Sequence, residues 1–264
     1  MNSEPIVKMV VLDWAGTTLD FGCMAPSGAF VRAFAERGLA VTIAEARGPM
    51  GLHKKDHLRE MLRMARIGSA WEAAHGRPWQ ESDVDDLYRS VTPMQVAAAA
   101  EHAELVPNLI DDIRRLRDVG IKIAGSTGYF VEAAEVCYTR AAQQGYVPDF
   151  SICADEVPAG RPAPWMIYRC MEALGVYPPT AVAKVGDTVV DIRDGLNAGV
   201  WSIGVVDSSN EMGLSLAEFR SLAPGERDTR RKRVASIFRD AGAHAVVNTL
   251  AELPRALAGF GHPA

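Results

Sequence analysis

The stretch Val10-Val11-Leu12-Asp13-Trp14-Ala15-Gly16-Thr17-Thr18 decides the fold of this chain. Apolar residues run up to Asp13, and small or hydroxyl-bearing residues follow it, which is typical of a buried strand that ends in a tight turn. In open α/β sheets, ligands bind outside the carboxyl ends of the strands. A carboxylate placed there can attack phosphorus or hold a hard cation through oxygen. Ala15, two residues further on, can neither donate nor accept a proton.

The rest of the chain alternates between strands and helices around one helical insertion. We expect strands over Val7–Leu12, Ile121–Ala124, Phe150–Cys153, Ala181–Val185, Trp201–Val206 and near Ala245. Helical periodicity between them predicts an α/β fold, a doubly wound parallel sheet with helices on both faces. Residues 22–100 show helical patterns only, the first over Ser27–Arg37. We therefore expect an α/β core domain of residues 1–21 and 101–264, with an all-helical cap domain of residues 22–100 inserted after the first strand.

Composition points to a soluble protein with a small-molecule partner. The chain has 264 residues, a net charge of −5 and 48% hydrophobic residues, which gives no reason to expect nucleic acid or an anionic membrane as a partner. Its four cysteines are far apart and suggest reduced thiols. The beginning of the sequence lacks the apolar run of a signal peptide, so the expected location is the cytoplasm. The polar loop of residues 207–213 is expected to be mobile.

Polar side chains gather at the expected strand ends. They are Asp13, then Ser126 and Thr127, then Arg161 after a loop, then Asp187 with Asp191. All these ends face one edge of a parallel sheet, where the carboxylates can hold Mg²⁺ and the other groups can receive a phosphoryl group. A strand-end aspartate can instead simply cap the next helix. Because such groups occur at several strand ends, the pattern favours a metal- and phosphoryl-binding site over helix capping alone.

These motifs resemble those of the haloacid dehalogenase superfamily. The resemblance rests on Asp13-Trp-Ala-Gly-Thr-Thr, on Ser126-Thr127 and on Gly186-Asp187 followed by Asp191. It implies the Rossmann-like core of that superfamily. Most of its phosphatases carry a second aspartate two residues after the nucleophile, where this chain has Ala15. An ordinary phosphate ester would therefore lack the acid that protonates its leaving group.

The helical insertion offers a different reactive group. In Pro49-Met-Gly-Leu-His-Lys-Lys-Asp-His57, Lys54 lies just inside an expected helix start and His57 lies one turn further on. Most lysines are solvated surface residues. A lysine beside other cations and shielded from water has a lowered pKa, as a Schiff-base lysine requires. The neighbours His53 and Lys55 leave open which basic group would meet an aldehyde.

Together the motifs resemble the phosphonatase branch of the superfamily, the phosphonoacetaldehyde hydrolases, over nearly the whole chain. The added matches are Ala46-Arg-Gly-Pro-Met-Gly-Leu, Thr127-Gly-Tyr, Asp155-Glu-Val-Pro-Ala-Gly-Arg-Pro and Lys184-Val-Gly-Asp-Thr. The resemblance implies that Asp13 is the nucleophile, that Lys54 is the Schiff-base lysine and that His57 takes part in catalysis. It implies that Mg²⁺ is held by Asp13, the Ala15 carbonyl and Asp187, with Asp191 behind them. It also implies contacts to phosphate or substrate from Cys23, Met50, Ser126, Thr127, Gly128, Tyr129 and Arg161. Whether Ser126 or Thr127 supplies the main phosphate hydroxyl stays open.

The implied activity is hydrolysis of the carbon–phosphorus bond of phosphonoacetaldehyde to acetaldehyde and phosphate, in 2-aminoethylphosphonate degradation. The implied assembly is a homodimer formed through the cap domain. Two alternatives stay open: a phosphatase or phosphomutase of the same superfamily, and a phosphate-sensing regulator without catalysis. The three aspartates argue against the regulator.

Overall fold

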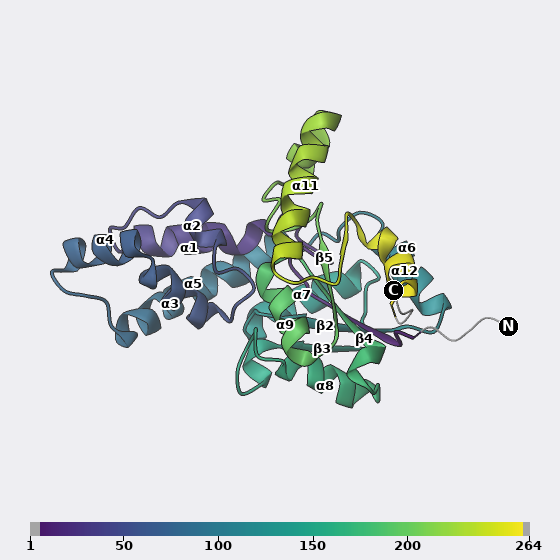
Figure 1. The fold of residues 1–264 in the computed structure, drawn as a ribbon. Coiled ribbons are helices and arrows are strands. Elements are labelled where there is room, and N and C mark those ends of the chain that lie inside the picture. The colour runs from purple at the N-terminus through teal and green to yellow at the C-terminus, as the bar shows by residue number, and fades with distance from the viewer. Residues whose placement is uncertain (1–5, 261–264) are drawn as a thin grey trace.

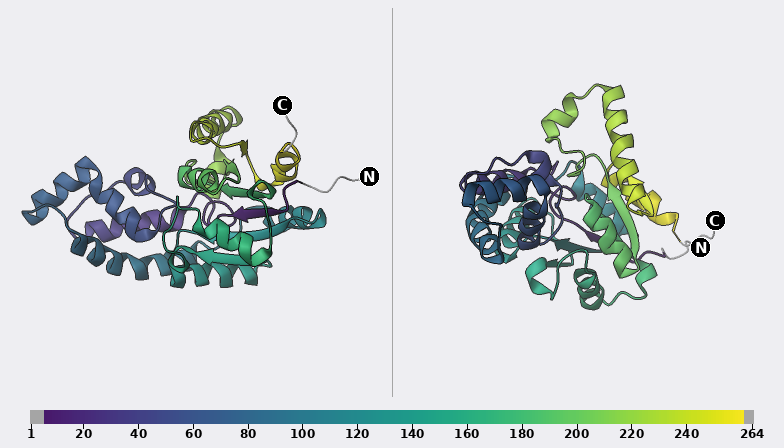
Figure 2. Two further views of the ribbon diagram at one scale, coloured as in Figure 1. Left: turned by 60° about the horizontal axis from the view of Figure 1, so that its bottom comes forward. Right: turned by 60° about the vertical axis from the view of Figure 1, so that its left-hand side comes forward.

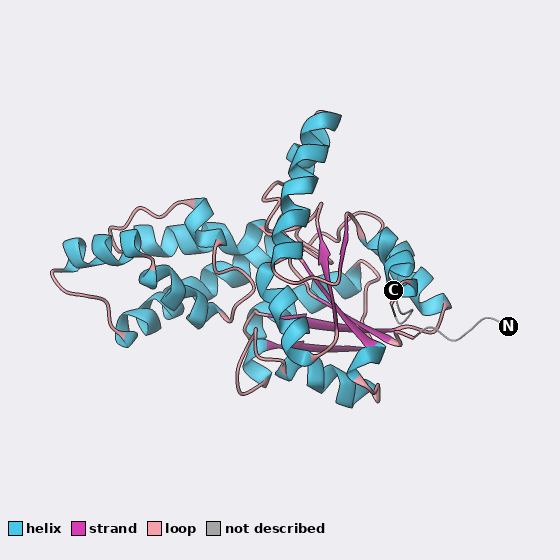
Figure 3. Cartoon of the chain, viewed as in Figure 1, coloured by secondary structure: helices cyan, strands magenta, loops and turns pink. Residues whose placement is uncertain are grey.

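A single parallel sheet forms the centre of the protein, whose computed structural model describes residues 6–260. Its strand order is β3-β2-β1-β4-β5-β6, and every neighbouring pair is parallel. The strands are β1 (Met9–Leu12), β2 (Lys122–Thr127), β3 (Phe150–Cys153), β4 (Val182–Gly186), β5 (Trp201–Val205) and β6 (Ala245–Val247). Figure 3 shows them together in one lobe of the molecule. The expected doubly wound sheet is confirmed.

Helices cover both faces of this sheet because successive strand residues point to opposite sides. Val10 and Leu12 of β1 join one hydrophobic cluster, and Met9 and Val11 join another. The first face is covered by α6 (Leu109–Asp118), α7 (Val131–Gln143) and α12 (Leu253–Ala258). The second is covered by α8 (Trp165–Leu174), α9 (Val189–Ala198) and α11 (Pro224–Asp240).

A separate helical lobe follows β1 and forms the left part of Figure 1. Its helices are α1 (Met24–Ala35), α2 (Ile43–Arg47), α3 (Lys54–Arg63), α4 (Ala65–His75) and α5 (Glu81–Glu101). They enclose their own core, which includes Phe30, Phe34, Leu58, Trp71 and Leu87. We call this lobe the cap.

Two linkers run side by side between the cap and the sheet domain (Figure 2). The Asp20 amide donates to the Glu104 carbonyl at 3.0 Å. The Asp20 carboxylate then accepts the amides of Met24 (2.9 Å) and Ala25 (3.0 Å). Helix α1 therefore begins at Met24, three residues before the predicted Ser27, because a side chain from the linker satisfies its first N–H groups.

Short elements complete the described chain: the turns η1 (Ala154–Glu156), η2 (Pro179–Ala181) and η3 (Leu250–Glu252), and helix α10 (Leu216–Ser221). Within residues 6–260, no helix combines the length and apolar character needed to span a membrane.

The separate core of the cap leads to a stability prediction. Trp71 is 2% exposed and stacks on His75 with ring centroids 4.1 Å apart. We expect Trp71→Ala to lower the free energy of unfolding of the cap by about 3–5 kcal/mol, measured by denaturant unfolding followed by circular dichroism. The control Trp165→Ala removes a ring that is 46% exposed and should cost less than about 1 kcal/mol. Equal losses in the two variants would contradict a packed cap core.

Candidate active site

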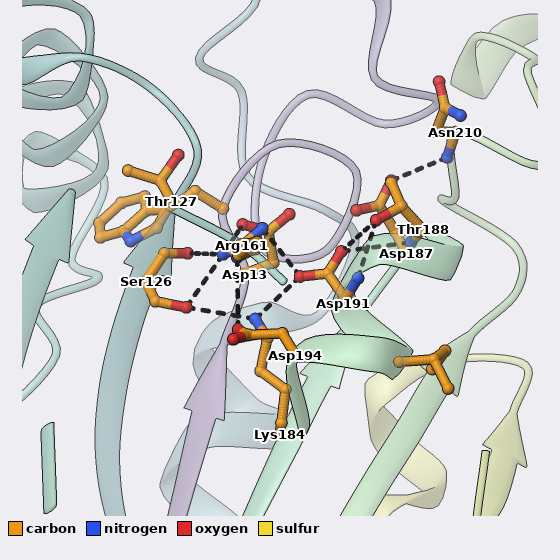
Figure 4. Close-up of polar contacts among 12 residues, drawn as sticks. Asp13, Ser126, Thr127, Arg161, Lys184, Asp187, Thr188, Asp191, Asp194 and Asn210 are labelled. Carbon is orange, nitrogen blue, oxygen red and sulfur yellow. Dashed lines mark hydrogen bonds and ion pairs between the residues drawn. The ribbon is translucent and has the colours of Figure 1, made fainter. Parts of the chain in front are cut away.

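The candidate site lies where the strand order reverses, between β1 and β4. Asp13 follows β1 and Asp187 follows β4, so both carboxylates leave the sheet at the same edge (Figure 4). The Asp13 amide donates to the Val185 carbonyl at 2.9 Å, which continues the strand pairing up to the aspartate. At Gly16 (φ +86°), a Cβ would lie 2.0 Å from Asp187 Oδ2. Only glycine therefore lets the turn approach this carboxylate.

The turn after Asp13 is held by its own backbone. The Trp14 carbonyl accepts the amides of Thr17, Thr18 and Leu19 at 2.8–3.1 Å. The Thr18 hydroxyl donates to the Asp13 carbonyl at 3.1 Å. These bonds fix the direction in which the Asp13 side chain leaves the strand, and they place Ala15 at the wall of a cavity.

Three buried carboxylates converge at this edge and could hold a metal ion. One oxygen each from Asp13, Asp187 and Asp191 lies within 4.8 Å of the others. Asp187 Oδ2 accepts the amide of Asn210 at 2.8 Å, whereas Asp187 Oδ1 is buried and finds no hydrogen-bond partner among residues 6–260. Burial, and then the negative charges of Asp13 and Asp191, raise the pKa of Asp187 well above its usual range. A bound cation would offset the repulsion among these carboxylates, and oxygen ligands suit a hard divalent ion.

Asp191 differs from the other two because its oxygens are already occupied. Its Oδ2 accepts the Thr188 hydroxyl at 2.6 Å, and its Oδ1 lies 2.8 Å from Arg161 and 2.9 Å from Lys184. Burial alone would raise the pKa of Asp191, but the charges of Arg161 and Lys184 hold it below its usual value. This arrangement places Asp191 behind Asp13 and Asp187 as a partner of the cations.

Arg161 is the centre of the network in Figure 4. Its Nη2 lies 2.7 Å from Asp13 Oδ1 and also donates to the carbonyl (2.5 Å) and hydroxyl (2.9 Å) oxygens of Ser126. Its Nε lies 3.6 Å from Asp194. Burial alone would lower the pKa of Arg161, but the surrounding carboxylates raise it above its usual value. The guanidinium is therefore a fixed positive charge against the Asp13 carboxylate.

Sequence reasoning missed two members of this network, Lys184 and Asp194. Lys184 lies on β4, is fully buried, and its Nζ contacts Asp191 and, at 3.2 Å, the Ser126 hydroxyl. Burial raises the pKa of Asp194 to about 7. The sequence signal that could have found Lys184 is its position inside an otherwise apolar strand. A lysine in such a strand is rarely buried without a charged or polar partner.

The two hydroxyls at the end of β2 have different surroundings. Ser126 Oγ is engaged by Arg161 and Lys184, behind the cavity. Thr127 lines the cavity together with Gly128, and its Oγ1 accepts the Tyr129 amide at 3.1 Å. Of the two, Thr127 is the hydroxyl that a ligand in the cavity would meet.

Lys54, the first residue of α3, brings a basic group from the cap into the same cavity. The lining also includes Cys23, Pro26, Met50, Gly51 and Tyr129. Lys54 is 4% exposed, and its Nζ lies 4.7 Å from the centroid of the Tyr129 ring. Burial lowers its pKa from the usual lysine value. A larger open cleft, about 1480 Å³, runs between α3 and residues 160–164, and of the residues that line the cavity only Arg161 also lines this cleft.

The neighbours of Lys54 point elsewhere. Lys55 pairs with Asp85 of the cap, at the surface. His53 precedes α3 as its N-cap, and its Nε2 lies 2.9 Å from Asp155 Oδ1 of the sheet domain. The structure thus distinguishes the three basic residues: among them, Lys54 alone lines the cavity.

His57 is buried one turn after Lys54 but lies outside the set of residues that line the cavity. Its Nε2 is 2.9 Å from the Ala46 carbonyl, and its ring stacks on Phe30 at 3.9 Å between centroids. Burial, followed by the charge of Lys54, lowers the pKa of His57 well below its usual value. The imidazole is therefore neutral, and its Nδ1 has no hydrogen-bond partner within the part of the chain that the structure describes.

The loop of residues 207–213 was expected to be mobile, and the structure shows that most of it is buried. The side chains of Ser208, Ser209 and Asn210 are buried, and Asp207 pairs with Arg231 of α11. The Gly22 amide of the cap linker donates to the Ser208 carbonyl at 2.8 Å. A polar composition suggested solvent exposure, but these groups instead satisfy one another and the cap.

Comparisons with known proteins agree with this geometry. A model of the haloacid dehalogenase-like hydrolase family matches residues 7–199. A phosphonoacetaldehyde hydrolase of Syntrophobacter fumaroxidans is 48% identical over 94% of this chain and 90% of its own length. A protein of the same name from Bacillus cereus is 41% identical over 94% of both chains. The crystal structure of a phosphonoacetaldehyde hydrolase like protein from Oleispira antarctica has a TM-score of 0.94 and 37% identity, covering 98% of this chain and 97% of that one.

Proposed function

Since the chain belongs to the haloacid dehalogenase-like hydrolases, in the family of the phosphonoacetaldehyde hydrolases, we propose that it hydrolyses the carbon–phosphorus bond of phosphonoacetaldehyde to acetaldehyde and phosphate. One observation carries this proposal. A single cavity is lined by Lys54, Asp13 and Ala15, which bring together an amine-bearing residue, a carboxylate-bearing residue and a residue without an acid. Carbon is a poor leaving group, so cleavage needs an electron sink rather than a proton donor.

The first proposed step is condensation of the Lys54 amine with the substrate aldehyde, which forms an imine and releases water. Only a neutral amine attacks a carbonyl carbon, and burial favours the neutral form of Lys54. The imine nitrogen then carries a proton and becomes an electron sink two bonds from the carbon–phosphorus bond. We propose that His57 exchanges protons with Lys54 through its unpartnered Nδ1.

In the second step, an Asp13 oxygen attacks phosphorus and the carbon–phosphorus electron pair moves into the iminium, which becomes an enamine. Arg161, already 2.7 Å from Asp13, and the backbone at Thr127 and Gly128 would stabilise the charge on the phosphoryl oxygens. Cys23, Met50 and Tyr129 would surround the two-carbon part of the substrate. Burial raises the pKa of Cys23 well above its usual value, so it is an uncharged lining residue.

The last steps return the enzyme to its starting state. The enamine takes a proton on carbon, and water hydrolyses the resulting imine to acetaldehyde and the free Lys54 amine. A second water hydrolyses the aspartyl phosphate and releases phosphate from Asp13. No alkoxide leaves in this sequence, which accounts for the absence of an acid at Ala15.

The residues present fit a divalent ion, which we propose to be Mg²⁺. Asp13, the Ala15 carbonyl and Asp187 would hold it, with Asp191 behind them. Support comes from the unpartnered Oδ1 of buried Asp187 and from the charge repulsion among the carboxylates. When bound, the ion supplies positive charge to the phosphoryl oxygens.

We further propose that residues 22–100 move as a unit. The cavity measures about 20 Å³, room for about one water molecule, so the substrate can enter only when the cap swings away. A homodimer formed through the cap, a cytoplasmic location and a place in 2-aminoethylphosphonate degradation stay part of the proposal. Light scattering of the purified protein would test the dimer.

Reductive trapping tests the function. Borohydride added to the protein with phosphonoacetaldehyde should leave a two-carbon adduct on Lys54, located by peptide mass mapping, while phosphate release requires Mg²⁺. The trapped fraction should rise with pH along a curve whose midpoint lies below the usual lysine pKa, because burial lowers the pKa of Lys54.

An adduct on Lys55 would keep the reaction but contradict the role of Lys54. Hydrolysis of phosphate esters without any adduct would indicate the alternative phosphatase or phosphomutase. Binding of phosphate without turnover of any substrate would indicate a regulator.

A further inference from the structure

Asn210 forms contacts that join the cap to Asp187 of the sheet domain. Asn210 belongs to the loop after β5 and is 5% exposed. Its amide donates to Asp187 Oδ2 at 2.8 Å, which fixes one oxygen of that carboxylate, and Oδ1 has no hydrogen-bond partner among the described residues. The turn that aims this amide is itself held, because Ser209 Oγ donates to the Val206 carbonyl at 2.7 Å and accepts the Met212 amide at 2.9 Å.

The other polar atoms of Asn210 face the cap. Arg47, the last residue of α2, donates from Nη1 to the Asn210 side-chain oxygen (3.2 Å) and carbonyl oxygen (3.3 Å). In return, Asn210 Nδ2 lies 3.4 Å from the Arg47 carbonyl. The same Nη1 donates to the Gly22 carbonyl of the linker at 2.7 Å. One guanidinium therefore ties together the cap, the linker and the loop that orients Asp187.

We propose that Arg47 and Asn210 are positioning residues that couple closure of the cap to the metal-binding carboxylate Asp187. The proposal rests on the metal site of the proposed function. Arg47 precedes Lys54 by seven residues, in the segment that also carries Met50 and Gly51. The movement that brings Lys54 into the cavity thus seats Arg47 on Asn210. Opening the cap removes the contacts of Asn210 with Arg47 and loosens the loop behind Asp187.

The coupling must act in both directions, because linkage between two equilibria is reciprocal. A closed cap favours the ion, and a bound ion favours the closed cap. The full affinity for the cation then arises only when Lys54 lies in the cavity. The nucleophile Asp13 therefore has both the cation and Lys54 beside it only in the closed enzyme.

The test measures ion binding rather than turnover. In the full-length protein, Mg²⁺ affinity is measured by calorimetry and Mn²⁺ affinity by electron paramagnetic resonance. We expect Arg47→Met and Asn210→Ala each to weaken binding about 10-fold, the lower end of the range for residues that support metal ligands. The double variant should bind the ion no more weakly than the weaker-binding single variant, because both substitutions remove the same contact between Arg47 and Asn210.

The matched control is His53→Gln. It removes a different contact between the cap and the sheet domain, that of His53 with Asp155, which involves neither Asp187 nor its loop. Binding in this variant should stay within about 2-fold of wild type. A second measurement follows protease cleavage in the linkers: Mg²⁺ should protect the wild type and the control, but not Arg47→Met.

The outcomes separate this inference from the proposed function. If the wild type binds neither ion, or if Asp187→Asn binds as well as wild type, the metal site itself is wrong. If the wild type binds through Asp187 and both link variants bind equally well, only the coupling is wrong. Equal weakening of ion binding in His53→Gln and in the Arg47 and Asn210 variants would also overturn the inference. The loss would then follow from any disturbance of cap closure and not from the contact between Arg47 and Asn210.

Discussion

Lys54→Arg is expected to lower the rate of phosphonoacetaldehyde cleavage by at least ~10⁴-fold, or about 5.5 kcal/mol of transition-state stabilisation at 25 °C. Arginine places a positive charge over the Tyr129 ring, as the protonated imine of Lys54 would, but it cannot form an imine because its guanidinium stays protonated. The loss would therefore measure the imine rather than the charge. Steady-state phosphate release and borohydride trapping would both be recorded.

Two controls make this result specific. Lys55→Arg changes the neighbouring lysine, whose partner is Asp85 at the surface, and should stay within about 2-fold of wild type. Acetyl phosphate offers a leaving group that needs neither an imine nor a proton donor, so Lys54→Arg should still release phosphate from it at a rate close to wild type. Loss of both activities would show that the substitution damages the Asp13 site, and cleavage of the phosphonate near the wild-type rate would eliminate the imine mechanism.

The sheet could be predicted from the sequence because its signals are local. Val10-Val11-Leu12 followed by Asp13 marks a buried strand and its end within a few residues, and the same pattern recurs before Asp187. Parallel pairing then follows from the helices between strands. The start of α1 could not be predicted in this way. Its capping carboxylate, Asp20, lies in the linker, four residues before the helix and outside the helical pattern.

The candidate site was only partly accessible to sequence reasoning for a similar reason. Motif residues such as Asp13, Lys54 and Arg161 are recognisable one at a time. Their supporting contacts join distant positions: Lys184 meets Ser126 across 58 residues, and Arg47 meets Asn210 across 163. A lysine in a strand or an asparagine in a polar loop gives no local sign of such a partner. The loop of residues 207–213 was therefore predicted only to be a mobile polar loop, although Asn210 within it donates to Asp187.

Asp13→Asn is expected to reduce phosphate release by at least ~10⁴-fold, as loss of a nucleophile does in other enzymes. The amide is a far weaker nucleophile than the carboxylate, and it would also withdraw the negative charge next to Arg161. The guanidinium should nevertheless keep its place, because Asp191 (2.8 Å) and Ser126 (2.9 Å) still hold it. Unchanged circular dichroism and unfolding would confirm that the site remains folded.

The two variants divide the reaction between its two halves. Asp13→Asn leaves the cap chemistry intact, so borohydride should still trap the substrate on Lys54, now with its phosphonate group attached. Lys54→Arg should give no adduct but should still accept a phosphoryl group from acetyl phosphate. Mass mapping of both proteins after trapping distinguishes these outcomes. A two-carbon adduct without phosphorus in Asp13→Asn would show that the bond breaks without this carboxylate, and another group would then have to be the nucleophile.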